Sequence, residues 1–432
     1  MICDNLTINE KGHLTFACVD TIDIVEKYGS PLYVLDEDRI RNNCRRYINA
    51  FNKYFTNGSK VLYASKANCF KQMYQIISQE KLGIDVVSIG EIYTAFKAGF
   101  DLSNAYFHGN NKTDDDIRFA LDHQVGYFVV DNEEELDSLN RIAEEKELIQ
   151  KILIRITPGI DPHTYEEVST GQVDSKFGNA IITGQAEKIV SMALNMRNID
   201  LVGLHCHVGS QVFEEDVHEK SMKVLLEFAS ELKRKYNYEL RELNIGGGFG
   251  VRYVEEDPYI NIEEKIKELA ELFHHTCKQL GLNEPVFIME PGRSIIADCG
   301  ITLYKVGSLK KIEGYKNYVS IDGGMTDNPR YALYKSRYTC LCANKMNEEN
   351  NLKCDLVGRC CESGDIIQRN IYLPLSIKRD DVIAVCITGA YNYSMSSNYN
   401  RLPKPATVMI KDQKPYLVVK RESLDDMMKN EL

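Results

Sequence analysis

A lysine stands directly after a short apolar segment, in the stretch Tyr63–Asn68 (YASKAN). An amine held at the end of a strand, beside a buried core, can form a Schiff base with a carbonyl compound. A lysine after a strand is more often a solvated loop residue, so this spacing alone does not give Lys66 a catalytic role. The residues at the ends of the other apolar segments distinguish the two interpretations.

Polar residues recur where those other segments end. Asp85 lies within the second segment, His108 ends the third, Arg155 lies near the end of the fifth, and His205 and His207 end the sixth. Since side-chain direction repeats every two residues along a strand, the last two histidines share a face. The pair could ligate a metal ion, but no third ligand has suitable spacing, so no metal site is predicted. Hydrogen-bonded core histidines, or an imidazole packed on a flat aromatic ligand, are the alternatives.

Two glycine-containing stretches favour an anion site. Gly246–Gly250 has the sequence GGGFG, and Glu290–Arg293 has the sequence EPGR. Consecutive glycines let backbone N–H groups approach an anion closely, and Arg293 adds positive charge. A lone glycine run is usually a flexible turn. The loops after the last two strands of a barrel, however, often bind phosphate, and both stretches occupy such positions.

Glu290 ends an apolar segment, where a carboxylate is costly unless it is paired. Its partner is either Arg293, in a structural pairing, or a protonated pyridine nitrogen, the usual partner of an acid in pyridoxal-phosphate enzymes. A lysine, a phosphate-binding loop, an acid and a histidine together are what this cofactor needs.

The elements that must position these residues alternate between short apolar strands and helical patterns. Starts of the first five strands are about 21 to 25 residues apart, as strand–helix units require, and the later intervals are longer. Eight units predict a (β/α)8 barrel, and a doubly wound open sheet is the alternative. The predicted strands are Val61–Ala64, Ile84–Val87, Ala105–His108, Tyr127–Val130, Ile152–Ile156, Leu201–Cys206, Glu242–Ile245 and Val286–Met289.

Helical spacing of apolar residues predicts one amphipathic helix over 36–55, ahead of the barrel. After residue 295 the pattern changes to short β-rich segments, which predict a second, mostly antiparallel β domain. We therefore expect a cofactor-binding barrel over 36–294 and a C-terminal β domain over 295–432, joined by residues 1–35. The β-rich segments are Ile301–Val306, Tyr318–Ile321, Asp355–Val357, Ile371–Leu375, Val382–Cys386, Ala406–Ile410 and Tyr416–Val419.

The composition excludes several classes of function. The net charge of -11 over 432 residues, without a cluster of Lys or Arg, argues against a nucleic-acid partner. The N-terminus has no secretory signal, and no apolar run is long enough to span a bilayer. The 13 cysteines are odd in number and scattered, which is typical of a reducing compartment. We expect a cytoplasmic enzyme.

With these motifs in order, the sequence closely resembles the diaminopimelate decarboxylases, a family of pyridoxal-phosphate enzymes with an alanine-racemase-like barrel. The resemblance covers nearly the whole chain. One departure is Ser65, where the family usually has an apolar residue. The matching stretches are Tyr63–Asn68, Ser169–Gly178, His205–Gln211, Gly246–Gly250, Glu290–Arg293, Asp322–Arg330, Cys360–Asp365 and Thr388–Tyr391.

The resemblance implies how pyridoxal 5'-phosphate would be held. Lys66 would form a Schiff base with the cofactor, Glu290 would pair with the ring nitrogen, and His207 would stack on the ring. The other cofactor residues, at its polar edge or on the phosphate side, would be Ser210, Gly248, Gly292, Arg293 and Tyr391.

It also implies the reaction, in which meso-2,6-diaminopimelate is decarboxylated to L-lysine in the last step of lysine biosynthesis. The distal carboxylate of this substrate suits the planar fork of Arg330, and its distal ammonium suits Glu362. Cys361 would be the proton donor, supplied across a homodimer interface to Lys66 of the other subunit; a buried structural thiol is the alternative. The implied substrate residues are Arg293, Arg330, Tyr334, Glu362 and Tyr391.

Three other functions fit the same fold. A relative could decarboxylate carboxynorspermidine, arginine or ornithine, but Arg330, Tyr334 and the Cys-Glu-Ser stretch favour diaminopimelate. A non-catalytic regulator would be expected to lose Lys66 or Cys361, and both are present. A racemase would be expected to carry different sequence motifs in its β domain.

Overall fold

The structure is a computed structural model of the chain and describes residues 1–160, 172–214 and 216–432. These residues form two compact units. The barrel unit comprises Asn43–Gly250 and Ile260–Ser294, and the β unit comprises Met1–Asn42, Val251–Tyr259 and Ile295–Leu432.

Eight parallel strands close the barrel unit. β13 pairs with β5 at one seam and β8 pairs with β9 at another, so the ring has no open edge. The predicted (β/α)8 barrel is confirmed, and the open sheet is wrong. The strands are β5 (Ser59–Ala64), β6 (Gly83–Val86), β7 (Ala105–Phe107), β8 (Tyr127–Val130), β9 (Gln150–Thr157), β11 (Ile199–His205), β12 (Glu242–Asn244) and β13 (Val286–Met289), and β10 (Asn179–Ala180) adds to β9.

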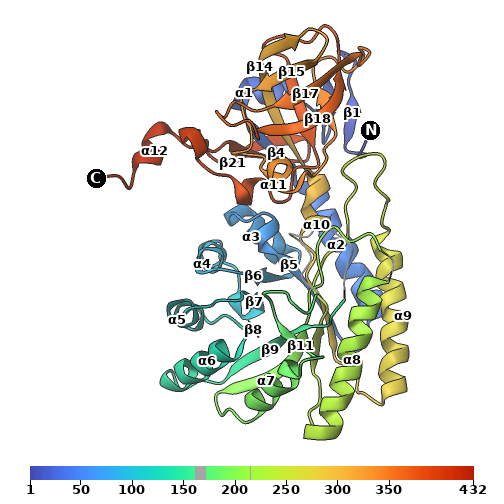
Figure 1. The fold of residues 1–432 in the computed structure, drawn as a ribbon, viewed down its shortest axis with the longest axis vertical. Coiled ribbons are helices and arrows are strands. Elements are labelled where there is room, and N and C mark those ends of the chain that lie inside the picture. The colour runs from blue at the N-terminus through green and yellow to red at the C-terminus, as the bar shows by residue number, and fades with distance from the viewer. Residues whose placement is uncertain (161–171, 215) are drawn as a thin grey trace. The chain divides into compact units, whose positions relative to one another are not determined.

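Helices follow the strands and lie on the outside of the barrel (Figure 1). The predicted amphipathic helix before β5 is α2 (Glu37–Tyr54). The outer helices are α3 (Lys71–Gln79), α4 (Ile89–Lys97), α5 (Asp114–Asp122), α6 (Glu133–Glu145), α7 (Gln185–Leu194), α8 (Val217–Tyr236) and α9 (Ile262–Leu280). None of the helices in the described part of the chain is both long and apolar enough to cross a membrane.

Apolar side chains from the strands fill the barrel, which is why it is a packed core and not a pore. One buried cluster gathers residues from six of the eight strands: Leu62, Tyr106, Val129, Leu153, Val202 and Ile288. Polar residues follow at the strand ends, where the chain leaves this core.

The N-terminus of α5 shows how the sequence ends a loop and starts a helix. The Thr113 hydroxyl accepts a hydrogen bond from the Asp116 N–H, and the Asp116 carboxylate accepts one from the Thr113 N–H. Acids at Asp114, Asp115 and Asp116 also favour the positive end of the helix dipole. This cap fixes the end of the loop that carries His108.

The β unit contains a mostly antiparallel sheet in the order β18-β17-β15-β14-β4-β20-β21, with β19 on β14 and β16 on β19. Two pairs are parallel, β15 with β17 and β20 with β4. The strands are β4 (Leu32–Asp36), β14 (Gly300–Ile312), β15 (Lys316–Ile321), β16 (Cys340–Cys342), β17 (Leu352–Val357), β18 (Ile366–Leu373), β19 (Val382–Cys386), β20 (Ala406–Lys411) and β21 (Lys414–Val419).

The N-terminal residues contribute strands to this unit. β1 (Leu6–Ile8), β2 (Leu14–Phe16) and β3 (Val19–Asp20) form a small antiparallel sheet before α1 (Thr21–Tyr28). β16 was not predicted, because a three-residue strand offers no period to detect. The remaining short helices are α10 (Arg293–Ile296), α11 (Arg330–Tyr334) and α12 (Leu424–Met428).

Candidate active site

Lys66 lies where β5 ends. A short 3-10 helix, Ser65–Ala67, turns the chain, and the Tyr63 hydroxyl donates to the Asn68 carbonyl at 2.8 Å to close the turn. The Lys66 ammonium is 3.1 Å from one oxygen of Asp85, which is buried in β6. The lysine is thus a partly exposed amine held by a buried carboxylate, and not a solvated loop residue.

Gly292 lets the chain after β13 pass close to this turn. A Cβ built on Gly292 would lie 2.8 Å from the Cβ of Ala64 and 3.1 Å from the Cβ of Ala67. Such separations are too short for any side chain, so glycine is required at this approach. The loop that carries Arg293 is therefore packed directly against the segment that carries Lys66.

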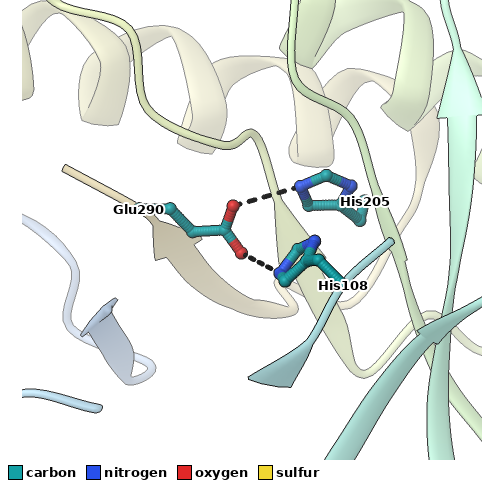
Figure 2. A group of neighbouring side chains, drawn as sticks. All are labelled: His108, His205 and Glu290. Carbon is teal, nitrogen blue, oxygen red and sulfur yellow. Dashed lines mark hydrogen bonds and ion pairs between the residues drawn. The ribbon is translucent and has the colours of Figure 1, made fainter. Parts of the chain in front are cut away.

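Glu290 is buried at the end of β13 and is contacted on both of its oxygens (Figure 2). His108 Nε2 lies 2.9 Å from Oε1, and His205 Nε2 lies 3.2 Å from Oε2. Asn244 Nδ2 also donates to Oε1, at 2.7 Å. The partner of Glu290 inside the protein is therefore this polar cluster, and not Arg293.

The environment of Glu290 sets its charge. Burial favours the neutral acid, but the two imidazoles outweigh burial and hold the pKa of Glu290 well below its usual range. Burial lowers the pKa of His205 to about 4, although Glu290 opposes this shift. Near neutral pH the cluster therefore contains a carboxylate beside a neutral His205.

The loop Gly246–Gly250, after β12, is packed and not flexible. Gly246 and Gly248 have φ values of 71° and 119°, in the region that favours glycine. A Cβ on Gly247 would lie 2.2 Å from the Glu290 carbonyl oxygen, and one on Gly248 would lie 2.4 Å from the Gly209 carbonyl oxygen. The backbone of this loop is thus packed closely against its neighbours, and glycine is required where it approaches them.

Two side chains after β11 are fixed by this loop and by Arg293. The Gly247 N–H donates to His207 Nδ1 at 3.3 Å. Burial, with a smaller effect of the Lys66 charge, holds the pKa of His207 well below its usual range, so this imidazole is neutral. The Arg293 guanidinium donates from Nε and Nη2 to the Ser210 hydroxyl at 3.2 and 3.1 Å.

The structure brings the predicted cofactor residues of the barrel unit to the ends of its strands. The other predicted residues, which include all but one of the substrate set, belong to the β unit. In the barrel unit these are Lys66, His207, Ser210, Gly248, Glu290, Gly292 and Arg293; in the β unit they are Arg330, Tyr334, Cys361, Glu362 and Tyr391. Residues 169–171 of the predicted motif Ser169–Gly178 lie outside the described residues.

Arg330, at the start of α11, is a buried cation. It donates from Nη1 to the Tyr338 hydroxyl at 2.8 Å and from Nη2 to the Ser336 hydroxyl at 3.1 Å, and its guanidinium lies 4.7 Å from the centre of the Tyr253 ring. In the described chain it has no carboxylate within ion-pair distance, and its Nε has no acceptor. A buried cation with an unused donor indicates a site for an anion.

Cys361 is exposed, whereas Cys360 beside it is buried. Its N–H donates to the Asn400 side chain at 2.7 Å, and the Cys360 N–H donates to Asp365 at 2.7 Å, which fixes the loop. Burial raises the pKa of the Cys360 thiol to about 12. The interpretation of Cys361 as a buried structural thiol is therefore wrong. Glu362 is likewise exposed.

Sequence reasoning gave no role to several residues around Glu290. Asp85 and His108 were noted only as polar residues in or at the end of a strand, His205 was left between a metal ligand and a core histidine, and Asn244 was not singled out. Figure 2 shows the two histidines on Glu290. The available signal was the amide side chain of Asn244 at the end of an apolar strand, separated by Ile245 alone from three glycines. His205 meets His108 and Glu290 and fits the alternative of a hydrogen-bonded core histidine.

The family described as "Pyridoxal-dependent decarboxylase, pyridoxal binding domain" matches residues 37–297. This stretch contains the barrel and every site residue of the barrel unit. Together with the lysine, acid and glycine loop, it defines an enzyme of the pyridoxal-dependent decarboxylase class, a carboxy-lyase.

Proteins of similar sequence and structure narrow this class of enzyme to one family. A protein named diaminopimelate decarboxylase from Bacillus methanolicus is 44% identical over 417 residues, 96% of this chain and 96% of that one. Another from Bacillus subtilis (strain 168) is 42% identical and covers 98% and 96%. The crystal structure of diaminopimelate decarboxylase from M. jannaschii in co-complex with L-lysine has a TM-score of 0.91 and 31% identity, covering 99% and 98%. The chain belongs to the diaminopimelate decarboxylase family.

Proposed function

We propose that this enzyme uses pyridoxal 5'-phosphate to decarboxylate meso-2,6-diaminopimelate to L-lysine. The family membership supports the reaction, and a structural relative was solved in co-complex with L-lysine, the expected product. The observation that carries the choice of substrate is Arg330, a buried guanidinium with an unused Nε donor. A substrate that keeps a second carboxylate after decarboxylation would satisfy it.

The residues of the barrel unit fit this cofactor. An ionised, buried Glu290 is the partner that a protonated pyridine nitrogen needs. The backbone of Gly246–Gly250, where side chains would clash, and the guanidinium of Arg293 suit a phosphate. We assign covalent attachment to Lys66, packing on the ring to His207, and contacts at the polar edge to Ser210. Gly248, Gly292 and Tyr391 complete the proposed cofactor set.

When bound, the cofactor supplies the electron sink that takes up the electron pair left by the departing carboxylate. The residues of the chain carry out the other tasks. Lys66 would supply the amine that the substrate amine replaces, Glu290 would keep the ring nitrogen protonated, and the Cys361 thiol would give its proton to the α-carbon that has lost its carboxylate. Arg330, with Arg293, Tyr334 and Tyr391, holds the carboxylate that stays, and Glu362 holds the distal ammonium.

We further propose a homodimer in which Cys361 of one subunit serves Lys66 of the other, as the resemblance implies. We keep the proposed division into a cofactor-binding barrel 36–294 and a β domain 295–432 with residues 1–35, from which the compact units differ in that residues 36–42 and Val251–Tyr259 lie with the β unit. We place the enzyme in the cytoplasm, where a reducing environment would keep thiols free, and all thirteen cysteines have free thiols.

Substrate choice is tested by measuring carbon dioxide release from the purified enzyme, with pyridoxal phosphate, on a panel of amino acids. We expect release from meso-diaminopimelate and little from lysine, ornithine or arginine. In Arg330→Ala, KM for diaminopimelate should rise by about 10- to 100-fold, the effect of losing hydrogen bonds to a charged group. Arg337→Ala is the matched control, because Arg337 is exposed and pairs with Glu256. Equal release from ornithine, or an unchanged KM in folded Arg330→Ala, would contradict the proposal.

The donor role of Cys361 makes a separate prediction. Cys361→Ala should lower kcat at saturating substrate by about 100-fold, the lower end of the effect of a proton-transferring group, because the carbanion loses its donor. Cys18→Ala is a matched exposed control. Turnover of Cys361→Ala close to that of the wild type would remove Cys361 from the mechanism.

A further inference from the structure

The cluster in Figure 2 contains two histidines to which the proposed mechanism gives no task. We propose that His108 and His205 are positioning residues that fix the Glu290 carboxylate in its ionised form, and that His108 links this carboxylate to the Asp85–Lys66 pair. The inference rests on the proposed role of Glu290 as the partner of the ring nitrogen. It concerns how the protein prepares that carboxylate, and it can be tested without the cofactor.

Contacts on both carboxylate oxygens fix the Glu290 side chain. Oε1 is met by His108 Nε2 at 2.9 Å and by Asn244 Nδ2 at 2.7 Å, and Oε2 is met by His205 Nε2 at 3.2 Å. All four side chains are buried, with relative exposures of 5% or less. A carboxylate with three such contacts keeps both its charge and its rotamer, although burial alone would favour the neutral acid.

His205 can serve only in one form. Its Nε2 faces the Glu290 carboxylate, so the ring hydrogen must lie on Nε2 for a hydrogen bond to form. Its Nδ1 is buried and has no partner among the described residues, so a second proton there would be an unpaired buried donor. The geometry therefore selects the neutral Nε2–H tautomer.

His108 faces two carboxylates. Its Nε2 is 2.9 Å from Glu290 Oε1 and 3.8 Å from Asp85 Oδ1, and the other oxygen of Asp85 is 3.1 Å from the Lys66 ammonium. The approach to Glu290 is an ion-pair contact, and Asp85 is a more distant neighbour of the same nitrogen. The His108 imidazole therefore lies between the acid that would bond the ring nitrogen and the acid beside Lys66.

The consequence is a defined dependence on pH. A carboxylate whose donors lower its pKa keeps its charge above that pKa. Removing one donor raises the pKa of Glu290, so the charge is lost as pH falls through the raised value, and a neutral carboxyl group holds a pyridinium poorly. The other titratable groups that face the cluster are Lys66, Asp85, Asp131, Arg155, Cys206 and His207.

The test compares His108→Leu and His205→Leu with His108→Gln and His205→Gln, since glutamine retains an N–H donor and leucine does not. The first measurement is the dissociation constant of pyridoxal phosphate between pH 6 and 9 in the full-length enzyme. At pH 6 each Leu variant should bind about tenfold more weakly than the wild type, which equals about 1.4 kcal/mol, at the low end for a hydrogen bond to a charged group. The deficit should shrink toward pH 9, and the Gln variants should bind nearly as the wild type does.

The second measurement uses the protein without cofactor, with 15N-labelled histidine, so that it stands even if pyridoxal phosphate does not bind. The His205 signals, assigned by their loss in His205→Gln, should show a neutral Nε2–H ring from pH 5.5 to 8. An Nδ1–H or doubly protonated ring would overturn the proposal. So would Gln variants as weak as the Leu variants, Leu variants with the pH dependence of the wild type, or an affinity that changes on adding EDTA, which would make the three side chains a metal site. If the wild type binds no cofactor but His205 has the expected form, the proposed function fails while the fixing of Glu290 stands.

Discussion

Lys66→Ala should contain no covalently bound pyridoxal phosphate, and its kcat should fall sharply, because the amine that attaches the cofactor and exchanges with the substrate amine is lost. The reason is local. Lys66 presents its amine at the end of β5, 3.1 Å from a buried carboxylate of Asp85. The 3-10 helix Ser65–Ala67 and the close approach of Gly292 fix the backbone that carries this lysine.

Borohydride reduction followed by peptide mass analysis measures this directly, together with visible absorbance. In the wild type the label should be fixed on the peptide that contains Lys66. Lys71→Ala is the matched control, since Lys71 is exposed and only five positions further along the chain. A Lys66→Ala protein that keeps the absorbance, or a label that is found on another lysine, would contradict the assignment.

The barrel was predictable because its strands have a local signature: each is a short apolar segment bounded by turn residues, and polar residues follow at the strand ends. The sheet of the β unit was less predictable because its pairings join distant positions. β4 pairs with β14 on one side and with β20 on the other. Its residue Tyr33 lies opposite Thr302 of β14 and opposite Thr407 of β20. No local pattern near Tyr33 specifies partners so far along the chain.

The candidate site divides in the same way. Lys66, Glu290 and the glycine loop could be singled out from the sequence, because Glu290 is an acid at the end of an apolar segment and the other two directly follow such segments. The neighbours of Glu290 could not, since three different strands bring His108, His205 and Asn244 to one carboxylate, and only the closed barrel sets their distances. The neighbours of Arg330 could not be predicted either, because its contact with Tyr253 depends on tertiary folding of the β unit.

A buried ion pair next to the site makes the largest prediction for stability. Glu135→Ala should lower the free energy of unfolding of the barrel by about 3–5 kcal/mol, the effect of removing one partner of a buried pair. Lys112 donates to Glu135 Oε1 at 2.8 Å and to the carbonyls of Gly109 and Val129 at 2.9 Å. Both charged side chains are only 2% exposed, so the change leaves a buried ammonium without its counter-charge.

Scanning calorimetry measures the loss, and two comparisons identify its cause. Glu145→Ala removes an exposed partner of Arg118 and Arg141 on α6, the helix that also carries Glu135, and should leave the transition almost unchanged. The double variant Lys112→Met with Glu135→Leu should recover much of the stability lost in Glu135→Ala, because no unpaired charge remains. If the double variant were as unstable as the sum of the single variants, the loss would come from packing instead.

The loss of the Glu135 charge should also weaken pyridoxal phosphate binding. Lys112 bonds to Gly109, which lies beside His108, so the loop that holds His108 against Glu290 would loosen in Glu135→Ala.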